Sequence, residues 1–175
     1  APPNAGFSAT FTTCSNQPPF ALITKLGGTP QLNGTWTAPG GTPHNGIFTP
    51  GSSTAGAYIY SVPGTAPCAA AQATVTVVVN AAPNAGCNGA LTLCTNSGAA
   101  NLFPSLGCSP QTGGTWTRPG NIPHSGTFLV SVDPPGVYTY TAPGQAPCST
   151  ATATVTVTMN QAPNAGSNGS ATICG

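Results

Sequence analysis

Cysteine is the residue type in this sequence with the greatest capacity for chemistry. Seven cysteines occur among 175 residues, beside two histidines, two basic residues and a single acidic residue, Asp133. So many cysteines in a nearly neutral chain rich in strand-forming residues indicate disulfide bonds made in an oxidising compartment. There is no Cys-x-x-Cys, and the histidines do not stand at zinc-finger spacing from cysteine pairs. We therefore predict no metal site and no cofactor.

The scarcity of charge excludes several classes of function. The sequence has no glutamate, so it offers no carboxylate pair for glycoside hydrolysis and no oxygen cage for Ca²⁺. Lys25 and Arg118 cannot neutralise a run of phosphates, which argues against nucleic-acid binding. No apolar run has the length needed to span a bilayer. We predict a protein that is not an enzyme and does not span a membrane.

The histidines and aromatic residues also have structural interpretations. His44 and His124 recur in Pro-His-x-Gly-x-Phe, where a general base would need a nucleophile and an orienting partner. Because carboxylates are nearly absent, we interpret both as turn histidines that bond to nearby backbone. Trp36, Trp116 and the tyrosines could stack on a sugar, but their alternation with threonine favours a place in the core.

These residues recur at a fixed interval. The sequence matches itself without a gap when it is shifted by 80 positions. Among the equivalent sets are Cys14, Cys94 and Cys174; Trp36 and Trp116; His44 and His124; and Cys68 and Cys148. We predict one repeat over 1–80, a second over 81–160, and the first strand of a third over 161–175, either truncated or donated to a neighbour. The start at Ala1, without an initiator Met or a signal-peptide pattern, suggests a processed or excerpted chain.

Each repeat has the pattern of short strands separated by turns. In the second repeat the expected strands are 91–93, 102–106, 114–117, 127–130, 137–140 and 152–159, and Pro-Gly pairs supply turns. Along 152–159 threonines alternate with Ala, Val and Met, which is typical of a strand with one wet face. No helical periodicity is present. We predict an all-β fold of tandem immunoglobulin-like β-sandwiches, stapled by disulfides. Its expected core residues are Trp36, Trp116, Tyr58, Tyr60, Tyr138, Tyr140, Phe48 and Phe128.

The ordered motifs of each repeat carry a family resemblance. They run Pro-Asn-Ala-Gly, a strand ending in Cys, Gly-Thr-Trp-Thr, Gly-x-Tyr-x-Tyr, Ala-Pro-Cys and Ala-Thr-Val-Thr-Val. This set resembles the Ig-like repeats of very large Bacteroidota surface proteins, which are exported by the type IX secretion route and include gliding-motility adhesins. The resemblance covers essentially the whole chain. It implies a bacterial, secreted protein with a cell-surface or filamentous structural role.

Two of the cysteines break the periodicity. Cys87 and Cys108 have no counterparts in the first repeat, where Phe7 and Gly28 stand at the same positions. Two unmatched cysteines in one repeat most simply pair with each other. Both are also expected at the same end of a sandwich. We therefore predict a Cys87–Cys108 bond.

The pairing of the periodic cysteines has more than one solution. Bonds within repeats, Cys14–Cys68 and Cys94–Cys148, are the first expectation, and Cys174 then has its partner outside the chain or in a neighbour. However, Cys94 ends its strand on the outward face, whereas Cys148 stands in the loop before the last strand. In a standard sandwich those sites lie at opposite ends. Bridges between neighbours, such as Cys14 with Cys148, are the alternative, and free thiols are a third.

The leading functional hypothesis is structural. Sandwiches joined by a short Pro-containing connector would form a rod or filament, extracellular or at the cell surface, and low charge would favour contact with copies of itself or further repeats. The alternative is an adhesin module whose loops at the sandwich tip recognise glycan or protein. An adhesin should concentrate exposed aromatic residues in loops at one end, and the variable loop 131–135 has none.

Overall fold

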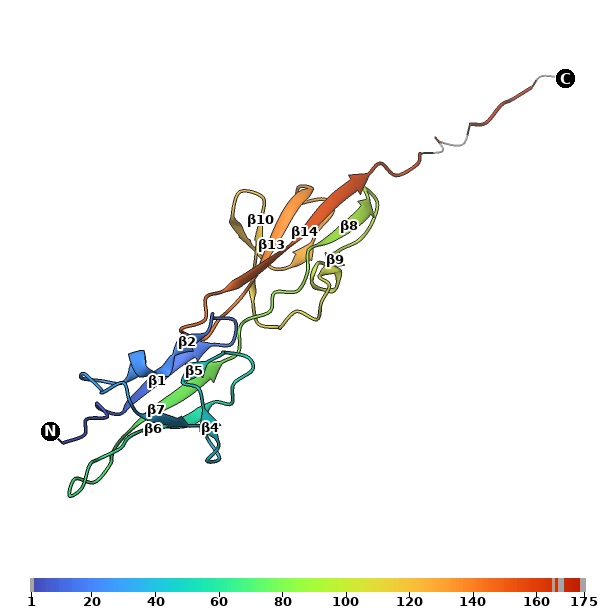
Figure 1. The fold of residues 1–175 in the computed structure, drawn as a ribbon. Coiled ribbons are helices and arrows are strands. Elements are labelled where there is room, and N and C mark those ends of the chain that lie inside the picture. The colour runs from blue at the N-terminus through green and yellow to red at the C-terminus, as the bar shows by residue number, and fades with distance from the viewer. Residues whose placement is uncertain (1, 165, 167–168, 174–175) are drawn as a thin grey trace. The chain divides into compact units, whose positions relative to one another are not determined.

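The computed structural model describes residues 2–164, 166 and 169–173 (Figure 1). The predicted all-β class is confirmed: the regular elements are strands apart from two short 3₁₀ turns. The chain folds into two compact units. Unit 1 comprises Ala1–Pro83 and Pro143–Thr150, and unit 2 comprises Asn84–Ala142 and Ala151–Gly175. The loop Pro143–Thr150 thus belongs to the second repeat by sequence and to unit 1 by structure.

Unit 1 contains a five-stranded sheet in the order β1-β7-β6-β3-β4 and a two-stranded sheet of β2 and β5. Its elements are β1 (Ala9–Cys14), β2 (Phe20–Ala21), η1 (Leu22–Lys25), β3 (Thr35–Thr37), β4 (Pro43–His44), β5 (Ile47–Phe48), β6 (Gly56–Val62) and β7 (Ala71–Asn80). Strand β1 pairs with β7 in parallel, so that Cys14 lies opposite Asn80 at the carboxyl end of both strands.

Unit 2 repeats this topology, with a five-stranded sheet in the order β11-β10-β13-β14-β8 and a two-stranded sheet of β12 and β9. Its elements are β8 (Gly89–Cys94), β9 (Ala100–Asn101), η2 (Phe103–Ser105), β10 (Thr115–Arg118), β11 (Ile122–His124), β12 (Thr127–Phe128), β13 (Gly136–Ala142) and β14 (Ala151–Asn160). Strand β8 pairs with β14 in parallel, which places Cys94 opposite Asn160.

Aromatic side chains fill both cores. All eight aromatic residues expected inside are buried, and each unit packs them around its own Trp–Tyr contact: Trp36 on Tyr60 and Trp116 on Tyr140. The hydroxyl of Tyr58 donates to Thr54 O (2.7 Å) and that of Tyr138 donates to Pro134 O (2.8 Å). This bond from a strand tyrosine to backbone four residues upstream is the tyrosine corner of immunoglobulin-like folds.

Some expected strands are shorter or of another kind. In place of the strand expected over 102–106, Phe103–Ser105 form a 3₁₀ turn, with Ser105 N–H donating to Leu102 O and Leu106 N–H donating to Phe103 O. Pro104 has no N–H to give to a sheet, whereas Leu102 and Leu106 still reach the core from the turn. Strand β12 ends at Phe128, and β11 was not expected.

The start of the expected third repeat forms no strand in the residues that the structure describes between 161 and 173. Cys174 lies outside the described residues, so its pairing stays a prediction. None of the helical turns in the described part of the chain is long or apolar enough to cross a membrane.

Candidate functional site

The central covalent feature is a disulfide inside unit 1. Cys14, at the end of β1, is bonded to Cys148 in the loop Pro143–Thr150, with an S–S distance of 2.06 Å and a Cα–Cα distance of 5.1 Å. The two cysteines are 134 residues apart in sequence. We call this bond, with the end of β1 and the loop that it holds, the clasp.

The first expectation for the periodic cysteines, pairing within repeats, is wrong, and pairing with a neighbouring repeat is found instead. The reason is the length of β7. Cys14 lies beside Asn80 at the end of β7, whereas Cys68 precedes its start at Ala71. Ten extended residues span roughly 33 Å, whereas a disulfide needs Cα atoms within about 7 Å. Cys14 therefore cannot reach Cys68 in the same sandwich.

Polar contacts support the clasp on both sides of the sulfurs. The side-chain amide of Asn80 donates to Ala146 O at 2.7 Å, and Cys148 Sγ lies 3.5 Å from Asn80 O. Thr13 and Cys14 are 4 % and 1 % exposed. Asn80 O also accepts the N–H of Ser15 at 2.9 Å, so the strand end that receives the loop is itself ordered by backbone bonds.

The predicted Cys87–Cys108 bond is confirmed. Its Cα atoms are 5.3 Å apart, and it staples the segment before β8 to the loop after η2 in unit 2. Cys87 also forms a two-way backbone bridge with Gly107, and Phe7 forms the same bridge with Gly27 in unit 1. The disulfide thus reinforces a connection that both units already make through backbone.

Two cysteines in the described residues have no disulfide partner. They are Cys68, in the loop before β7, and Cys94, at the end of β8, and both are exposed. By sequence position Cys68 corresponds to Cys148 and Cys94 corresponds to Cys14, because each pair is separated by 80 residues. The two free thiols are therefore the counterparts of the two halves of the clasp.

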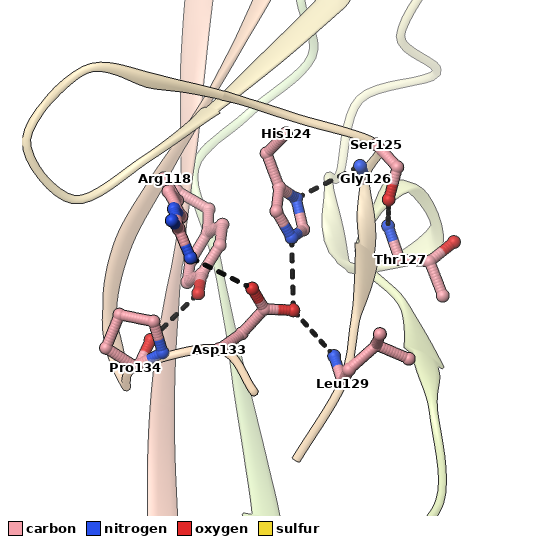
Figure 2. A network of polar contacts seen from close by, with 9 residues as sticks. Arg118, His124, Ser125, Gly126, Thr127, Leu129, Asp133 and Pro134 are labelled. Atoms are coloured by element: carbon pink, nitrogen blue, oxygen red, sulfur yellow. Dashed lines mark hydrogen bonds and ion pairs between the residues drawn. The ribbon is translucent and has the colours of Figure 1, made fainter. Parts of the chain in front are cut away.

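Unit 2 also holds an ionic cluster, drawn in Figure 2. Asp133 Oδ1 lies 3.6 Å from Arg118 Nη1, and its Oδ2 lies 3.2 Å from His124 Nε2 and accepts the Leu129 N–H at 2.8 Å. His124 Nδ1 accepts the N–H of Gly126 at 3.1 Å. Since Nδ1 acts as an acceptor, the ring proton belongs on Nε2, where it is donated to Asp133.

The cluster holds Asp133 in its ionised form. Burial of this carboxylate, whose side chain is 6 % exposed, raises the pKa of Asp133. The hydrogen bonds from Leu129 and His124 and the charge of nearby Arg118 outweigh burial, so that the pKa of Asp133 is lowered overall. Burial and the nearby Asp133 charge raise the pKa of Tyr138.

The cluster orders a turn. The turn interpretation is confirmed for both histidines. His44 Nδ1 accepts the Gly46 N–H at 3.0 Å, and His124 Nδ1 accepts the Gly126 N–H in the same way. Sequence reasoning missed Asp133 as the partner of His124. The available signal was that position 133 is acidic and position 118 basic in the second repeat only. Among the described residues no three metal-binding side chains gather at one place.

Each unit has its own shallow hollow beside its core tryptophan. In unit 1 it measures about 280 Å³ and is lined by Trp36, Tyr60 and Ile47. The counterpart in unit 2 measures about 230 Å³ and is lined by Trp116, Tyr140 and Phe103. Both are smaller than the roughly 300–1,000 Å³ of ordinary ligand pockets. The tryptophans are 8 % and 7 % exposed, so little aromatic face is open for stacking.

Comparison with known proteins identifies the fold. No protein-family model matches the sequence, and no curated protein matches it. The I-band fragment I67–I69 from titin is 12% identical, with a TM-score of 0.51 over 89% of this chain and 64% of that fragment. The insect immune protein hemolin is 13% identical, with a TM-score of 0.46 over 91% of this chain and 46% of that chain. The chain spans less than two thirds of the length of either structure.

The titin likeness and the tyrosine corners show that the chain is a tandem of immunoglobulin-like β-sandwiches. The disulfides Cys14–Cys148 and Cys87–Cys108 staple this tandem.

Proposed function

We propose that the chain is a structural repeat module of an extracellular filament or cell-surface stalk, which bears load and associates with further repeats or with copies of itself. The observation that carries the proposal is the clasp. A bond between residues 134 positions apart prevents the chain between them from extending when the two ends of the molecule are pulled. Such a bond is useful to a protein that must keep its length under tension.

The surface supports a role in assembly. The only charged side chains are Lys25, Arg118 and Asp133. Asp133 is buried against Arg118 and His124, and the Lys25 ammonium lies 4.1 Å from the centre of the Phe11 ring. With so little free charge, repulsion between copies is small and association depends weakly on ionic strength. This composition is suited to close packing of modules outside the cell.

The proposed location is the bacterial cell surface or the surrounding medium. Two disulfides fit an oxidising compartment. The motif set that resembles Bacteroidota surface repeats supports export by the type IX route. We propose no catalytic activity, because the histidine of the buried ionic cluster is held by the Gly126 N–H and by the Asp133 carboxylate.

Single-molecule stretching tests the load-bearing role. The chain is held at residues 1 and 175 and extended with the disulfides intact, and then with Cys14→Ala. Loss of the clasp should release roughly 400 Å of extra contour length, at about 3.5 Å per residue, because 21 of the 134 residues between Cys14 and Cys148 stay locked by Cys87–Cys108. Equal lengths for both proteins would refute the role of the clasp.

Electron microscopy of native material tests the form of the assembly. Long uniform fibres would support self-assembly of copies, whereas single thin whiskers anchored to cells would support a stalk made of one long chain. The absence of both fibres and whiskers from the cell surface would contradict the proposal.

The alternative function is an adhesin module. The observation that favours it is Phe7, an aromatic residue that is 73% exposed on unit 1. Binding on a glycan array that is lost in Phe7→Ala would support this alternative, and an array without hits at high protein concentration would weigh against it.

A further inference from the structure

We propose that Cys94 of one copy forms a disulfide with Cys68 of a second copy, so that copies join head to tail through an intermolecular clasp. The proposal rests on the structural function above and names the partner and the site. Its basis is that the described residues contain one closed clasp and, at the equivalent positions, two open halves.

The receiving half in unit 2 already has the geometry of the closed clasp. In unit 1, Ser15 N–H donates to Asn80 O, and Ala82 N–H donates to Ser15 Oγ, both at 2.9 Å. In unit 2, Thr95 N–H donates to Asn160 O, and Ala162 N–H donates to Thr95 Oγ1, again both at 2.9 Å. The backbone turn after the cysteine is also the same: the Gln17 N–H donates to Cys14 O in unit 1, and the Ser97 N–H donates to Cys94 O in unit 2.

The two cysteine sites differ in whether a loop covers the end of the strand. In unit 1 the loop Pro143–Thr150 lies over the end of β1, and Thr13 and Cys14 are buried. In unit 2, Cys94 is exposed and position 93 is a half-buried leucine where unit 1 has a threonine. Leu93 packs against the core of unit 2, and the part of it that stays open beside the exposed Cys94 thiol gives a second loop both surface to bury and an atom to bond.

The donating half is also formed in advance. In the loop 63–70 the Cys68 N–H donates to Thr65 O at 2.9 Å, as the Cys148 N–H donates to Gln145 O at 2.9 Å in the closed clasp. The two loops, Pro-Gly-Thr-Ala-Pro-Cys-Ala-Ala and Pro-Gly-Gln-Ala-Pro-Cys-Ser-Thr, share five of eight residues. Cys148 is 6 % exposed in the clasp, whereas Cys68 is exposed. Little conformational entropy remains to be lost when the loop docks.

The asymmetry of the chain selects a second copy as the partner. Within the part of the chain that the structure describes, each copy carries one receiving half in unit 2 and one donating half in unit 1, which are different surfaces. Contact between unlike surfaces of identical molecules is heterologous and propagates into an open chain unless the rotation closes a ring. Neither the loop 63–70 nor β8 contains a charged residue, so no like charges oppose the contact.

Formation of the bond requires an oxidant, which we take to be a disulfide of a small thiol or an oxidoreductase. The Cys94 thiolate attacks that disulfide and forms a mixed disulfide, with release of one reduced thiol. The Cys68 thiolate of the second copy then displaces the other thiol. In total two S–H bonds and one S–S bond break, one protein S–S bond forms, and the two hydrogens leave on the reduced oxidant.

The test is oxidation of the full chain with oxidised glutathione, followed by non-reducing electrophoresis and peptide mapping. In a Cys174→Ser background, which removes the other cysteine outside the two disulfides, the chain should give a ladder of oligomers, and adding Cys68→Ala or Cys94→Ala should abolish it. A mixture of the two variants should give a dimer that contains a Cys94–Cys68 peptide. The matched control is Cys94→Ala with Thr112→Cys, which moves the thiol to another exposed site on unit 2 and should cross-link roughly tenfold less.

Three results would overturn the proposal: a Cys174→Ser chain that stays monomeric with the Cys68 and Cys94 thiols both titratable, a Cys68–Cys94 bond within one copy, or Cys94–Cys94 dimers as abundant as the mixed dimer. None of these affects the contour length locked by Cys14–Cys148. Failure of the intermolecular clasp is therefore distinguishable from failure of the load-bearing function.

Discussion

Units 1 and 2 build one topology, and two of the equivalent places at which their residues differ can be compared directly. Where unit 2 has the Cys87–Cys108 bond, unit 1 has Phe7 and Gly28, and the Phe7 ring occupies the space that a Cβ on Gly28 would need. Gly28 has a φ of 73°, and Cys108 adopts nearly the same backbone, with a φ of 61°. The disulfide thus keeps a non-glycine residue in the left-handed conformation that unit 1 gives to glycine. Both units have the same backbone conformation at this position, and unit 2 adds a disulfide to it.

The second place is the turn after the histidine. In unit 1, Ser53 Oγ accepts the N–H of Thr49 at 3.0 Å. In unit 2, Asp133 Oδ2 accepts the N–H of Leu129 at 2.8 Å and adds its contacts to His124 and Arg118. A neutral hydroxyl and a carboxylate therefore perform the same backbone role. The comparison shows that the ionic cluster is a reinforced version of a turn, consistent with a structural module.

The largest expected effect is one that the two units share. Phe48 and Phe128 are both fully buried, so Phe48→Ala and Phe128→Ala should each destabilise their own unit by about 3–5 kcal/mol. Hydrogen exchange followed peptide by peptide measures each unit separately. Phe→Leu at either position should cost much less. A large effect in one unit and a small effect in the other would show that the two cores are not equivalent.

Replacing the Cys87–Cys108 disulfide of unit 2 by the phenylalanine and glycine that unit 1 has at the same positions should have the next largest effect. The chain-entropy estimate for a bond across 21 residues is about 3 kcal/mol. Glycine in place of Cys108 recovers about 1 kcal/mol, because it adopts positive φ freely. Cys87→Phe with Cys108→Gly should therefore destabilise unit 2 by about 2 kcal/mol in denaturant unfolding. The single variant Cys87→Ser is the control and should cost more.

Removing the charge at position 133 should have an intermediate effect that depends on pH. Asp133→Ser keeps the backbone contact that Ser53 makes and loses the ionic contacts, for a cost of about 1–2 kcal/mol at neutral pH. Because the pKa of Asp133 is lowered in the folded state, its stabilisation is complete above pH of about 4 and is lost as the pH falls below that value. Trp116 fluorescence during acid unfolding, in a Trp36→Phe background, would report unit 2. If wild type and Asp133→Ser lose stability in parallel on acidification, the cluster has no energetic role.

The smallest expected effect lies in unit 1. The Lys25 ammonium is 4.1 Å from the ring centre of Phe11 and 5.1 Å from that of Phe20, an arrangement worth about 0.5–1 kcal/mol at an exposed site. Lys25→Met keeps the aliphatic stem and removes the charge, so thermal unfolding should show a loss in this range. Ser105 stands at this position in unit 2, and Ser105→Met is the matched control, expected to show no comparable loss. A gain in stability from Lys25→Met would mean that the contact is apolar only.

The pairing of Cys87 with Cys108 and the burial of residues such as Trp36 and Tyr138 follow from patterns that are local in sequence. An apolar residue every second position predicts a strand face, and two cysteines absent from one repeat have only each other as simple partners. The cluster of Asp133 with Arg118 and His124 did not follow, because its three members come from a strand, its neighbour and a loop. Their approach depends on how the sandwich closes.

The 80-residue period and the alternation of threonine with valine are enough to establish the fold class and the core, since both reflect side-chain preferences along one strand at a time. The partner of Cys14 is a different kind of fact. It depends on β1 lying parallel to β7, which carries the thiol the full length of a strand away from Cys68 and into reach of Cys148. Contacts between residues 134 positions apart leave no periodic trace in a sequence, so folding in three dimensions had to settle which sulfurs meet.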